Sequence, residues 1–211
     1  MNKHDKTRYV FAQAIKGLIK VHPLDKIAVT DIVTRSGMTR QTFYRYFKDK
    51  YDLVNWYFEK LVLKSFRQMG DGCSLQEALQ LKFAFIKSEH SFFKEAFKSN
   101  DYNNLVNYDF NCIYEFYKNI IEKNLGQSVT ADIDFLLKMY CKGSIDMTVE
   151  WVLGDMPISI DDIVKLLIEA LPQRLEPFIL NIKKVGKHTF LLLQLNCMTI
   201  TKMLQTLTSV T

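Results

Sequence analysis

Proline is scarce in this chain, and its scarcity constrains the fold more than any other feature. Four prolines and eight glycines occur in 211 residues. Both residue types disrupt helix interiors, so a chain with so few of them can form long helices. Apolar residues also recur at helical spacing, as in the stripe of Phe11, Ala14, Ile15 and Leu18 within residues 5–21. The sequence therefore predicts an all-α fold.

The same periodicity predicts where the helices lie. They are expected over residues 5–21, after Thr30, and over 40–47, 52–69, 74–87, 91–98, 102–123, 131–153 and 159–171. Residues 181–211 differ, because they contain no Asp or Glu and show no clear period. A C-terminal extension, a swapped arm, and a cloning or frameshift artefact all stay open for that segment.

Positive charge is concentrated near the N-terminus. The first 60 residues hold twelve Lys or Arg against six Asp or Glu, whereas the remaining 151 hold sixteen against seventeen. Such asymmetry favours an anionic partner for the first part of the chain, although a solvated basic face would look the same.

Several classes of protein find no support in the sequence. The four cysteines, Cys73, Cys112, Cys141 and Cys197, form no C-x-x-C pair, so neither a disulfide framework nor a zinc site is expected. Sparse cysteine usage favours a reducing compartment, and we expect a cytoplasmic protein. No signal peptide or membrane-spanning stretch is recognisable. No catalytic motif, metal site or cofactor site is expected either.

Residues 30–50 form the most informative segment. Thr30 is predicted to cap a short helix, and Gly37 suits the left-handed conformation that ends one. Thr39 is predicted to cap the next helix, residues 40–47. Two short helices around a glycine-containing turn, preceded by a longer helix, make a helix-turn-helix, whose second helix enters the major groove of DNA.

The second of these helices has an apolar and a polar side. Phe43 and Phe47 are four residues apart, so both are expected to face the core. The outward side then carries Arg40, Gln41, Tyr44 and Arg45. Arginine pairs bidentately with guanine, and glutamine with adenine. Side chains suited to the DNA backbone are the hydroxyls of Thr39, Thr42, Tyr44 and Tyr46 and the ammonium groups of Lys48 and Lys50.

The run from Val29 to Leu53 closely resembles the N-terminal signature of the TetR family of regulators. The pattern G-x-[ST]-x-x-T-[FL]-Y-x-[YH]-F-x-x-K-x-x-L is matched at Gly37, Thr39, Thr42, Phe43, Tyr44, Tyr46, Phe47, Lys50 and Leu53. The resemblance covers about residues 5–55. It implies that residues 1–52 form a helix-turn-helix DNA-binding domain.

The resemblance also implies a role for each matched position. Arg40 and Gln41 would read bases, while Arg45 lies at a position that contacts either bases or phosphates. Lys50 and the N-terminal end of the helix near Thr30 would anchor the flanking DNA backbone. The hydroxyl-bearing residues Thr39, Thr42, Tyr44 and Tyr46 would bind phosphates.

Residues 53–180 would then form the helical domain that dimerises and often binds an effector in this family. The last two predicted helices, 131–153 and 159–171, would build a four-helix dimer interface. An apolar face suited to that role contains Ile163, Leu166, Leu167 and Ala170. The alternative is that this face packs only within the subunit.

Aromatic residues offer a possible effector pocket. The candidates are Phe83, Phe93, Phe110, Tyr114, Tyr117 and Tyr140, whose rings would favour a flat or apolar ligand. Aromatic residues at helical spacing are, however, more often part of the core. A narrower pattern, Gly143 followed by residues 150–154 and 159–163, is similar to a subset of the family associated with dihydroxyacetone-kinase operons.

The predicted function is that of a transcriptional regulator, a repressor by family default, which binds a palindromic DNA operator as a homodimer. A small-molecule or protein effector would relieve the binding. Two alternatives stay open: a helical protein-interaction module of the same fold that does not bind operators, and an α-helical enzyme.

Overall fold

Helices are the regular elements of the chain. The computed structural model describes residues 3–70, 74–101 and 103–180, with side chains in the same ranges apart from 3–4 and 61–70. The elements are α1 (Lys3–Ile19), η1 (Leu24–Lys26), α2 (Val29–Ser36), α3 (Arg40–Tyr46), α4 (Lys50–Gly70), α5 (Leu75–Ser88), α6 (His90–Phe97), α7 (Leu105–Leu125), α8 (Ala131–Leu153), α9 (Ile160–Glu169) and α10 (Glu176–Ile179). The predicted all-α fold is confirmed, while the segment 181–211 and residues Cys73 and Cys197 lie outside the described ranges.

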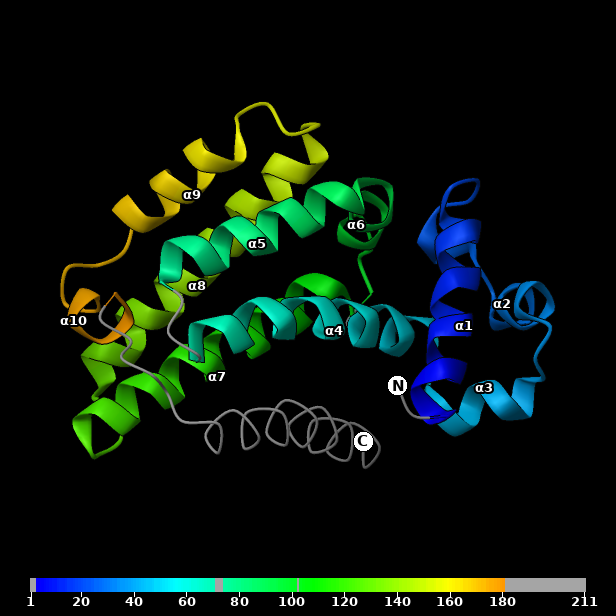
Figure 1. The fold of residues 1–211 in the computed structure, drawn as a ribbon, viewed down its shortest axis with the longest axis horizontal. Helices are drawn as coiled ribbons and strands as arrows, with labels where there is room; N and C mark the ends of the chain where they lie inside the picture. The colour runs from blue at the N-terminus through cyan, green and yellow to red at the C-terminus, as the bar shows by residue number, and fades with distance from the viewer. Residues whose placement is uncertain (1–2, 71–73, 102, 181–211) are drawn as a thin grey trace.

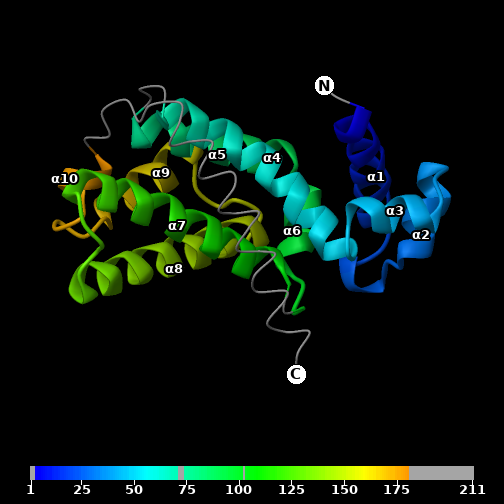
Figure 2. The same cartoon turned by 90° about the horizontal axis from the view of Figure 1, so that it is seen from below.

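The molecule is elongated and has two parts (Figures 1 and 2). Helices α1, α2 and α3 pack together at one end, and α4 runs from them into a bundle with the remaining helices. Within the bundle α7 lies along α8, α4 packs on α5 and α7, and α9 packs on α5. The boundary expected between residues 52 and 53 falls in the first turn of α4, so one continuous helix joins the two parts. The division into domains therefore stays a prediction.

An aromatic cluster fills the interior of the first part. Phe11 of α1 lies edge-on to Phe43 and Phe47 of the α3 segment, with ring centroids 5.3 and 6.2 Å apart. Phe47 also packs against Trp56 of α4, at 5.7 Å. All four rings are buried, and each such edge contact stabilises by about 0.5–1.5 kcal/mol beyond its burial. The expectation that Phe43 and Phe47 belong to the core is confirmed, and α3 is held by its inner face.

Capping residues fix the two ends of the turn before α3. Thr39 Oγ1 accepts a 3.1 Å hydrogen bond from the backbone N–H of Thr42, as expected of an N-cap. Gly37 has a φ of +67°, the left-handed conformation that glycine adopts without steric cost. These two local signals were both predicted correctly.

The cap predicted for α2 was wrong. The helix begins at Val29, and Thr30 already lies inside its first turn. Instead of a threonine hydroxyl, the Asp31 carboxylate accepts a 2.8 Å hydrogen bond from the backbone N–H of Ala28. A carboxylate at the third helical position can reach back to the preceding N–H, which is why the boundary lies two residues earlier than expected.

In the bundle, helix α8 has the bounds that the sequence predicted, whereas the end of the chain differs. The helix expected over residues 159–171 ends at Glu169, and Pro172 is followed by the short α10, which was not predicted. Pro177 lies in the first turn of α10, where a proline does not interrupt a helical hydrogen bond.

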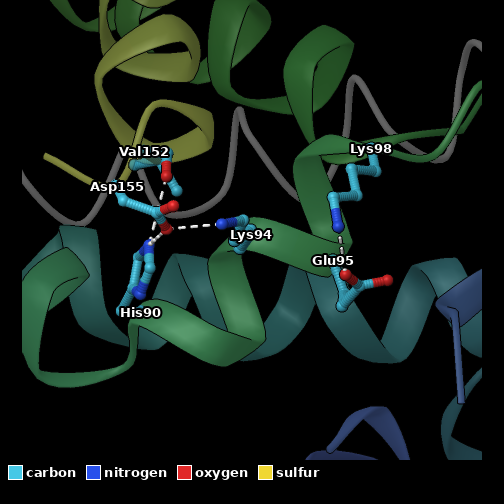
Figure 3. A network of polar contacts seen from close by, with 6 residues as sticks. All are labelled: His90, Lys94, Glu95, Lys98, Val152 and Asp155. Carbon is cyan, nitrogen blue, oxygen red and sulfur yellow. Dashed lines mark hydrogen bonds and ion pairs between the residues drawn. The ribbon is translucent and has the colours of Figure 1, made fainter.

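Polar contacts attach α6 to the end of α8 (Figure 3). His90 Nε2 lies 3.1 Å from the carbonyl oxygen of Val152 and 3.6 Å from Asp155 Oδ1, and Lys94 also forms an ion pair with Asp155. Asp155 and Met156 both have a φ of +60°, which is costly for residues other than glycine. The contacts from α6 therefore help to hold a strained turn between α8 and α9.

None of the helices in the described ranges has both the length and the apolar character needed to cross a membrane.

Candidate nucleic-acid interface

The outward side of α3 carries the predicted DNA-reading side chains. Arg40, Gln41, Tyr44 and Arg45 are all exposed, and Tyr44 is 54% exposed. Within the described part of the chain, no hydrogen bond or ion pair engages the two arginines or Gln41. An arginine without a carboxylate partner keeps its five N–H donors for an external acceptor. This side of α3 can therefore donate to base edges or phosphates.

The rigidity of α3 comes from the side of the helix that faces the protein. Phe43 is completely buried beneath Phe11, and its ring also touches Tyr44 edge-on at 5.5 Å. The hydroxyls of Thr39 and Thr42 lie 2.9 Å apart at the start of the helix. The outward side chains thus project from a helix that is anchored by its core face and its N-cap, as recognition at fixed geometry requires.

Lys50 makes contacts that the sequence did not reveal. Its Nζ donates 2.9 Å hydrogen bonds to the backbone carbonyls of Asp25 and Ile27, in the connector between α1 and α2. Burial lowers the pKa of its ammonium, although nearby carboxylates partly offset this. Lys50 therefore joins the start of α4 to the connector, and a contact to the DNA backbone stays a prediction.

The remaining predicted backbone-binding residues lie around the end of α3. Tyr46 is half-buried, with the Arg8 guanidinium 5.8 Å from its ring centroid. Lys48 is exposed, and its backbone N–H donates to Asp52 at 2.9 Å. Thr30 is exposed in the first turn of α2. These positions border the same end of the molecule as α3, and their contacts to phosphates stay predictions.

Four of the six expected pocket residues lie within the core. Phe83 and Phe93 have no exposed surface, and Tyr117 and Tyr140 are also buried. Phe83 packs edge-on against Trp151 at 5.2 Å. These rings fill the interior of the single chain, as the alternative interpretation of the aromatic pattern expected.

The other two lie on α7. Phe110 and Tyr114 are half-buried and stack at 5.7 Å, and Tyr114 donates a hydrogen bond to Asp134 of α8. The buried Tyr140 donates a 3.0 Å hydrogen bond to the carbonyl of Leu167 in α9. An effector pocket at any of the six residues stays a prediction.

A cavity of about 570 Å³ opens in a different place, between α1 and α2. It is lined by Lys6, Tyr9, Val10, Gln13, Ala14, Arg35 and Ser36. None of the six expected pocket residues borders it. No pattern in the sequence indicates this groove, because it depends on how two helices pack.

The face expected to bind a second subunit is divided. Ile163 and Leu167 are buried within their own subunit and offer little surface to a partner, so their place in a dimer interface stays a prediction. Leu166 is 55% exposed, and Ala170 is exposed too. The first two residues are buried and the last two exposed because α9 packs one of its sides on α5. The sequence does not show which apolar residues of α9 this contact covers.

Helix α8 carries exposed apolar side chains that were missed. Phe135, Met139 and Met147 are 62%, 59% and 47% exposed. Their spacing of four and eight residues was visible in the sequence as a second apolar stripe. It was masked by the buried stripe on the same helix, which includes Leu137 and Trp151.

Comparison with known proteins decides the family. Residues 13–55 match the model of bacterial regulatory proteins of the tetR family, and residues 74–173 match the model of a transcriptional regulator C-terminal region. The chain belongs to the TetR family of transcriptional regulators. The TetR family resemblance found from Val29 to Leu53 is thereby confirmed, and the matched families are regulators and not enzymes.

One curated relative narrows the placement within the TetR family. The HTH-type dhaKLM operon transcriptional activator DhaS of Lactococcus lactis subsp. lactis (strain IL1403) is 29% identical over 97 residues. The match spans 46% of this chain and about half, 52%, of the relative. This agrees with the narrower resemblance to regulators of dihydroxyacetone-kinase operons.

Two solved structures share the TetR fold. The dihydroxyacetone kinase operon activator DhaS superimposes with a TM-score of 0.58 and 19% identity, over 82% of this chain and 98% of that chain. The fatty acid degradation regulator FadR from Bacillus halodurans superimposes with a TM-score of 0.51 and 20% identity, over 81% of this chain and 95% of that one. At these identities the similarity concerns the fold.

Proposed function

We propose that the protein regulates transcription by binding a specific DNA operator through α3. The supporting observation is the exposed set of Arg40, Gln41 and Arg45, whose side chains have no hydrogen-bond or ion-pair partner in the described part of the chain. They project from a helix whose other side is fixed by the aromatic cluster. Arginine and glutamine at the start of such a helix can make bidentate contacts with guanine and adenine. The basic excess of the first 60 residues adds attraction to the phosphate backbone. A regulator that binds chromosomal DNA would act in the cytoplasm, where we expect this protein.

We further propose that the active form is a homodimer. Phe135, Met139 and Met147 of α8, together with Leu166 and Ala170 of α9, leave apolar surface exposed in the single chain. Large exposed apolar side chains that gather on neighbouring helices mark interaction surfaces. A two-fold dimer would present two copies of α3, and the operator would then be palindromic with half-sites about one helical turn or more apart.

An effector would act by changing the separation of the two α3 helices. Effector affinity and DNA affinity must then be coupled by the same factor in both directions. Repression is the default expected from the family, and the effector would release the operator. Activation is the second candidate, because the relative that matches this chain is a transcriptional activator.

Fluorescence anisotropy with labelled duplexes from the region upstream of the protein's own gene tests operator binding. We expect binding that weakens steeply with salt and that is lost on replacing Arg40 and Arg45 together by alanine. Lys87→Ala is the matched control, since Lys87 is an exposed cation on α5, away from α3. Normal dimers with no affinity for any duplex at low salt would instead establish the protein-interaction module. Transcription from the bound promoter then separates activation from repression.

A further inference from the structure

The groove between α1 and α2 has no part in the operator contacts proposed above. Its volume is about 570 Å³, and it lies in the first part of the molecule, where these two helices pack on each other (Figure 1). Concave sites of about 300–1,000 Å³ are typical of small-molecule binding. The groove therefore has the size of a ligand site, and the chemistry of its walls indicates which ligand it would hold.

One side of α1 forms the first wall of this groove. Lys6, Val10 and Gln13 follow one another at spacings of four and three residues, so they lie on the same side of the helix, with Tyr9 beside them. Val10 is 38% exposed, and Lys6 and Gln13 are exposed as well. Tyr9 is half-buried, and its ring lies edge-on to Trp56 at 5.1 Å. This wall places apolar surface between a cation and an amide.

Arg35 of α2 lies very close to α1. A Cβ atom built on Gly17 would come within 2.4 Å of both Nε and Nη2 of Arg35, which is closer than Cβ atoms approach other atoms in proteins. Glycine is unfavourable inside a helix, but it permits such a close approach. Gly17 therefore lets the guanidinium lie against α1, one turn beyond Gln13, at the groove that Arg35 also lines.

The groove carries positive charge that its own subunit does not neutralise. Lys6 and Arg35 have neither an ion pair nor a hydrogen bond in the part of the chain that the structure describes, and none of the described lining residues is acidic. Asp5, whose charge acts on Tyr9, forms an ion pair with Lys60 at 4.0 Å. Ammonium and guanidinium groups make strong hydrogen bonds to carboxylates and phosphates. The walls therefore favour an anion.

We propose that this groove binds a small organic anion. A carboxylate or phosphate group of the ligand pairs with Lys6 and Arg35, and an aromatic or aliphatic body packs on Tyr9 and Val10. The site is separate from an effector pocket in the helical bundle, because none of the six aromatic residues expected to form that pocket borders the groove.

A bound anion should weaken operator binding. Ser36 lines the groove and directly precedes Gly37, which ends α2 before the turn into α3. Phe11, the neighbour of Val10 on α1, packs against Phe43 of α3 at 5.3 Å. The anion also offsets positive charge that attracts the DNA backbone. This consequence rests on the proposed function, and DNA should then weaken binding of the anion by the same factor.

Isothermal titration calorimetry with phenyl phosphate tests the site directly. Inorganic phosphate and phenol represent the charged and the apolar part of this probe separately. We expect phenyl phosphate to bind the full-length chain with a dissociation constant of about 1 mM or below, at least about tenfold tighter than either part. Arg35→Ala and Lys6→Ala should each weaken its binding at least about fivefold. Lys87→Ala, which removes an exposed cation on α5, is the control and should bind like wild type.

Two further variants change the groove and preserve the fold. Gln13→Glu is nearly isosteric and exposed, and its carboxylate should weaken phenyl phosphate binding at least about tenfold through like-charge repulsion. Gly17→Ala favours the helix, but its Cβ would displace the Arg35 guanidinium, so binding should weaken at least about threefold without loss of stability. Thermal unfolding and far-UV circular dichroism show whether each variant is folded.

Several results would overturn the proposed site. Unchanged phenyl phosphate binding in Arg35→Ala and Gln13→Glu, or a loss caused by Arg40→Ala in their place, would locate the anion elsewhere. Equal affinities for phenyl phosphate and inorganic phosphate would show that the apolar surface has no part in binding. Absence of binding up to about 10 mM phenyl phosphate would exclude the site altogether.

The anisotropy assay on operator duplexes distinguishes this inference from the proposed function. Phenyl phosphate should raise the operator dissociation constant of the wild type at least about threefold and leave that of Gln13→Glu unchanged. Binding in the groove with no effect on operator affinity would overturn the coupling. A chain that binds phenyl phosphate in the groove but no duplex would refute the proposed function and leave the site in place. A chain that binds its operator but no phenyl phosphate would do the reverse.

Discussion

Lys16 Nζ lies 2.5 Å from Glu89 Oε1, and this ion pair joins α1 to the junction between α5 and α6. The same oxygen accepts a hydrogen bond from Tyr57 of α4 at 3.2 Å. Burial lowers the pKa of Lys16, but the hydrogen bonds with Glu89 and Tyr57 outweigh burial and leave that pKa above its usual value. The next residue, His90, contacts the end of α8. Glu89 contacts α1 and His90 contacts the end of α8, so these two adjacent residues connect α8 to the helix-turn-helix.

This ion pair should give a measurable coupling energy. Replacing Lys16 by methionine, Glu89 by glutamine, and both together forms a double-mutant cycle in urea unfolding. We expect a coupling of up to about 1 kcal/mol, because both side chains are partly exposed and water screens the interaction. Strictly additive effects of the two changes would show that the pair contributes nothing to stability.

Removal of Arg40 should affect DNA binding and leave folding unchanged. Its side chain is exposed and engages no described group, so Arg40→Ala should unfold like wild type. We expect a loss of about 1–3 kcal/mol of binding free energy on the preferred operator and a weaker preference between base pairs at one position of each half-site. Anisotropy on a set of singly substituted operators measures both. An equal loss on every sequence would identify Arg40 as a phosphate contact.

Lys50 should behave differently from Arg40. Its ammonium donates to two backbone carbonyls of the α1–α2 connector, so Lys50→Met should lower the free energy of unfolding by about 1–3 kcal/mol. Chemical denaturation measures this loss, with the exposed Lys20→Met as the control. The slope of DNA affinity against salt gives the second measurement. A fall of that slope by about one unit would show that Lys50 also binds a phosphate.

The buried pair of Lys82 and Asp109 should be costly to break and inexpensive to replace. The side chains are 5% and 0% exposed, with Lys82 Nζ 3.2 Å from Asp109 Oδ2, and Asp109 Oδ1 has no hydrogen-bond partner in the described structure. Lys82→Met alone or Asp109→Leu alone leaves a buried charge and should destabilise by about 3–5 kcal/mol. The double replacement should be close to neutral. Thermal unfolding compares all three, and a double variant as unstable as the sum of the single ones would contradict this account.

Asp25 should contribute stability that depends on pH. The hydrogen bond from Ser99 Oγ, at 2.7 Å, lowers the pKa of this carboxyl; burial opposes the shift, and a second bond from Tyr51, at 3.0 Å, adds to it. Because the folded-state pKa lies below the unfolded value of 3.8, the stabilisation is present above that pH and is lost as the pH falls through the folded-state pKa. Asp25→Asn should therefore be less stable than wild type near neutral pH.

Acidification should remove the difference in stability between wild type and Asp25→Asn. Melting temperatures measured from about pH 7 down to about pH 3 should converge as Asp25 becomes protonated in the wild type. Ser99→Ala is the matched variant, since it removes the strongest hydrogen bond to the same carboxyl and should show the same convergence with a smaller difference. A difference that persists in acid would mean that the carboxylate charge is not the cause.

The sequence by itself determined the helix-turn-helix and its family. Thr39 caps α3 through the N–H of a residue three positions away, and Gly37 ends α2 through its own backbone conformation. Phe43 and Phe47 fall on the inner side because of the helical repeat alone. All of these signals act over a few residues, so they could be recognised without knowing what packs against what.

Tertiary structure decided which apolar and charged groups are available. Ile163 is buried and Leu166 exposed only because α9 packs on α5, and Lys50 points into the connector only because α4 begins beside it. On α8, Phe135 and Met139 are exposed because α7 packs on another side of that helix. Burial depends on contacts between segments far apart in the chain, and periodicity within one helix cannot say which of two apolar stripes a neighbour will cover.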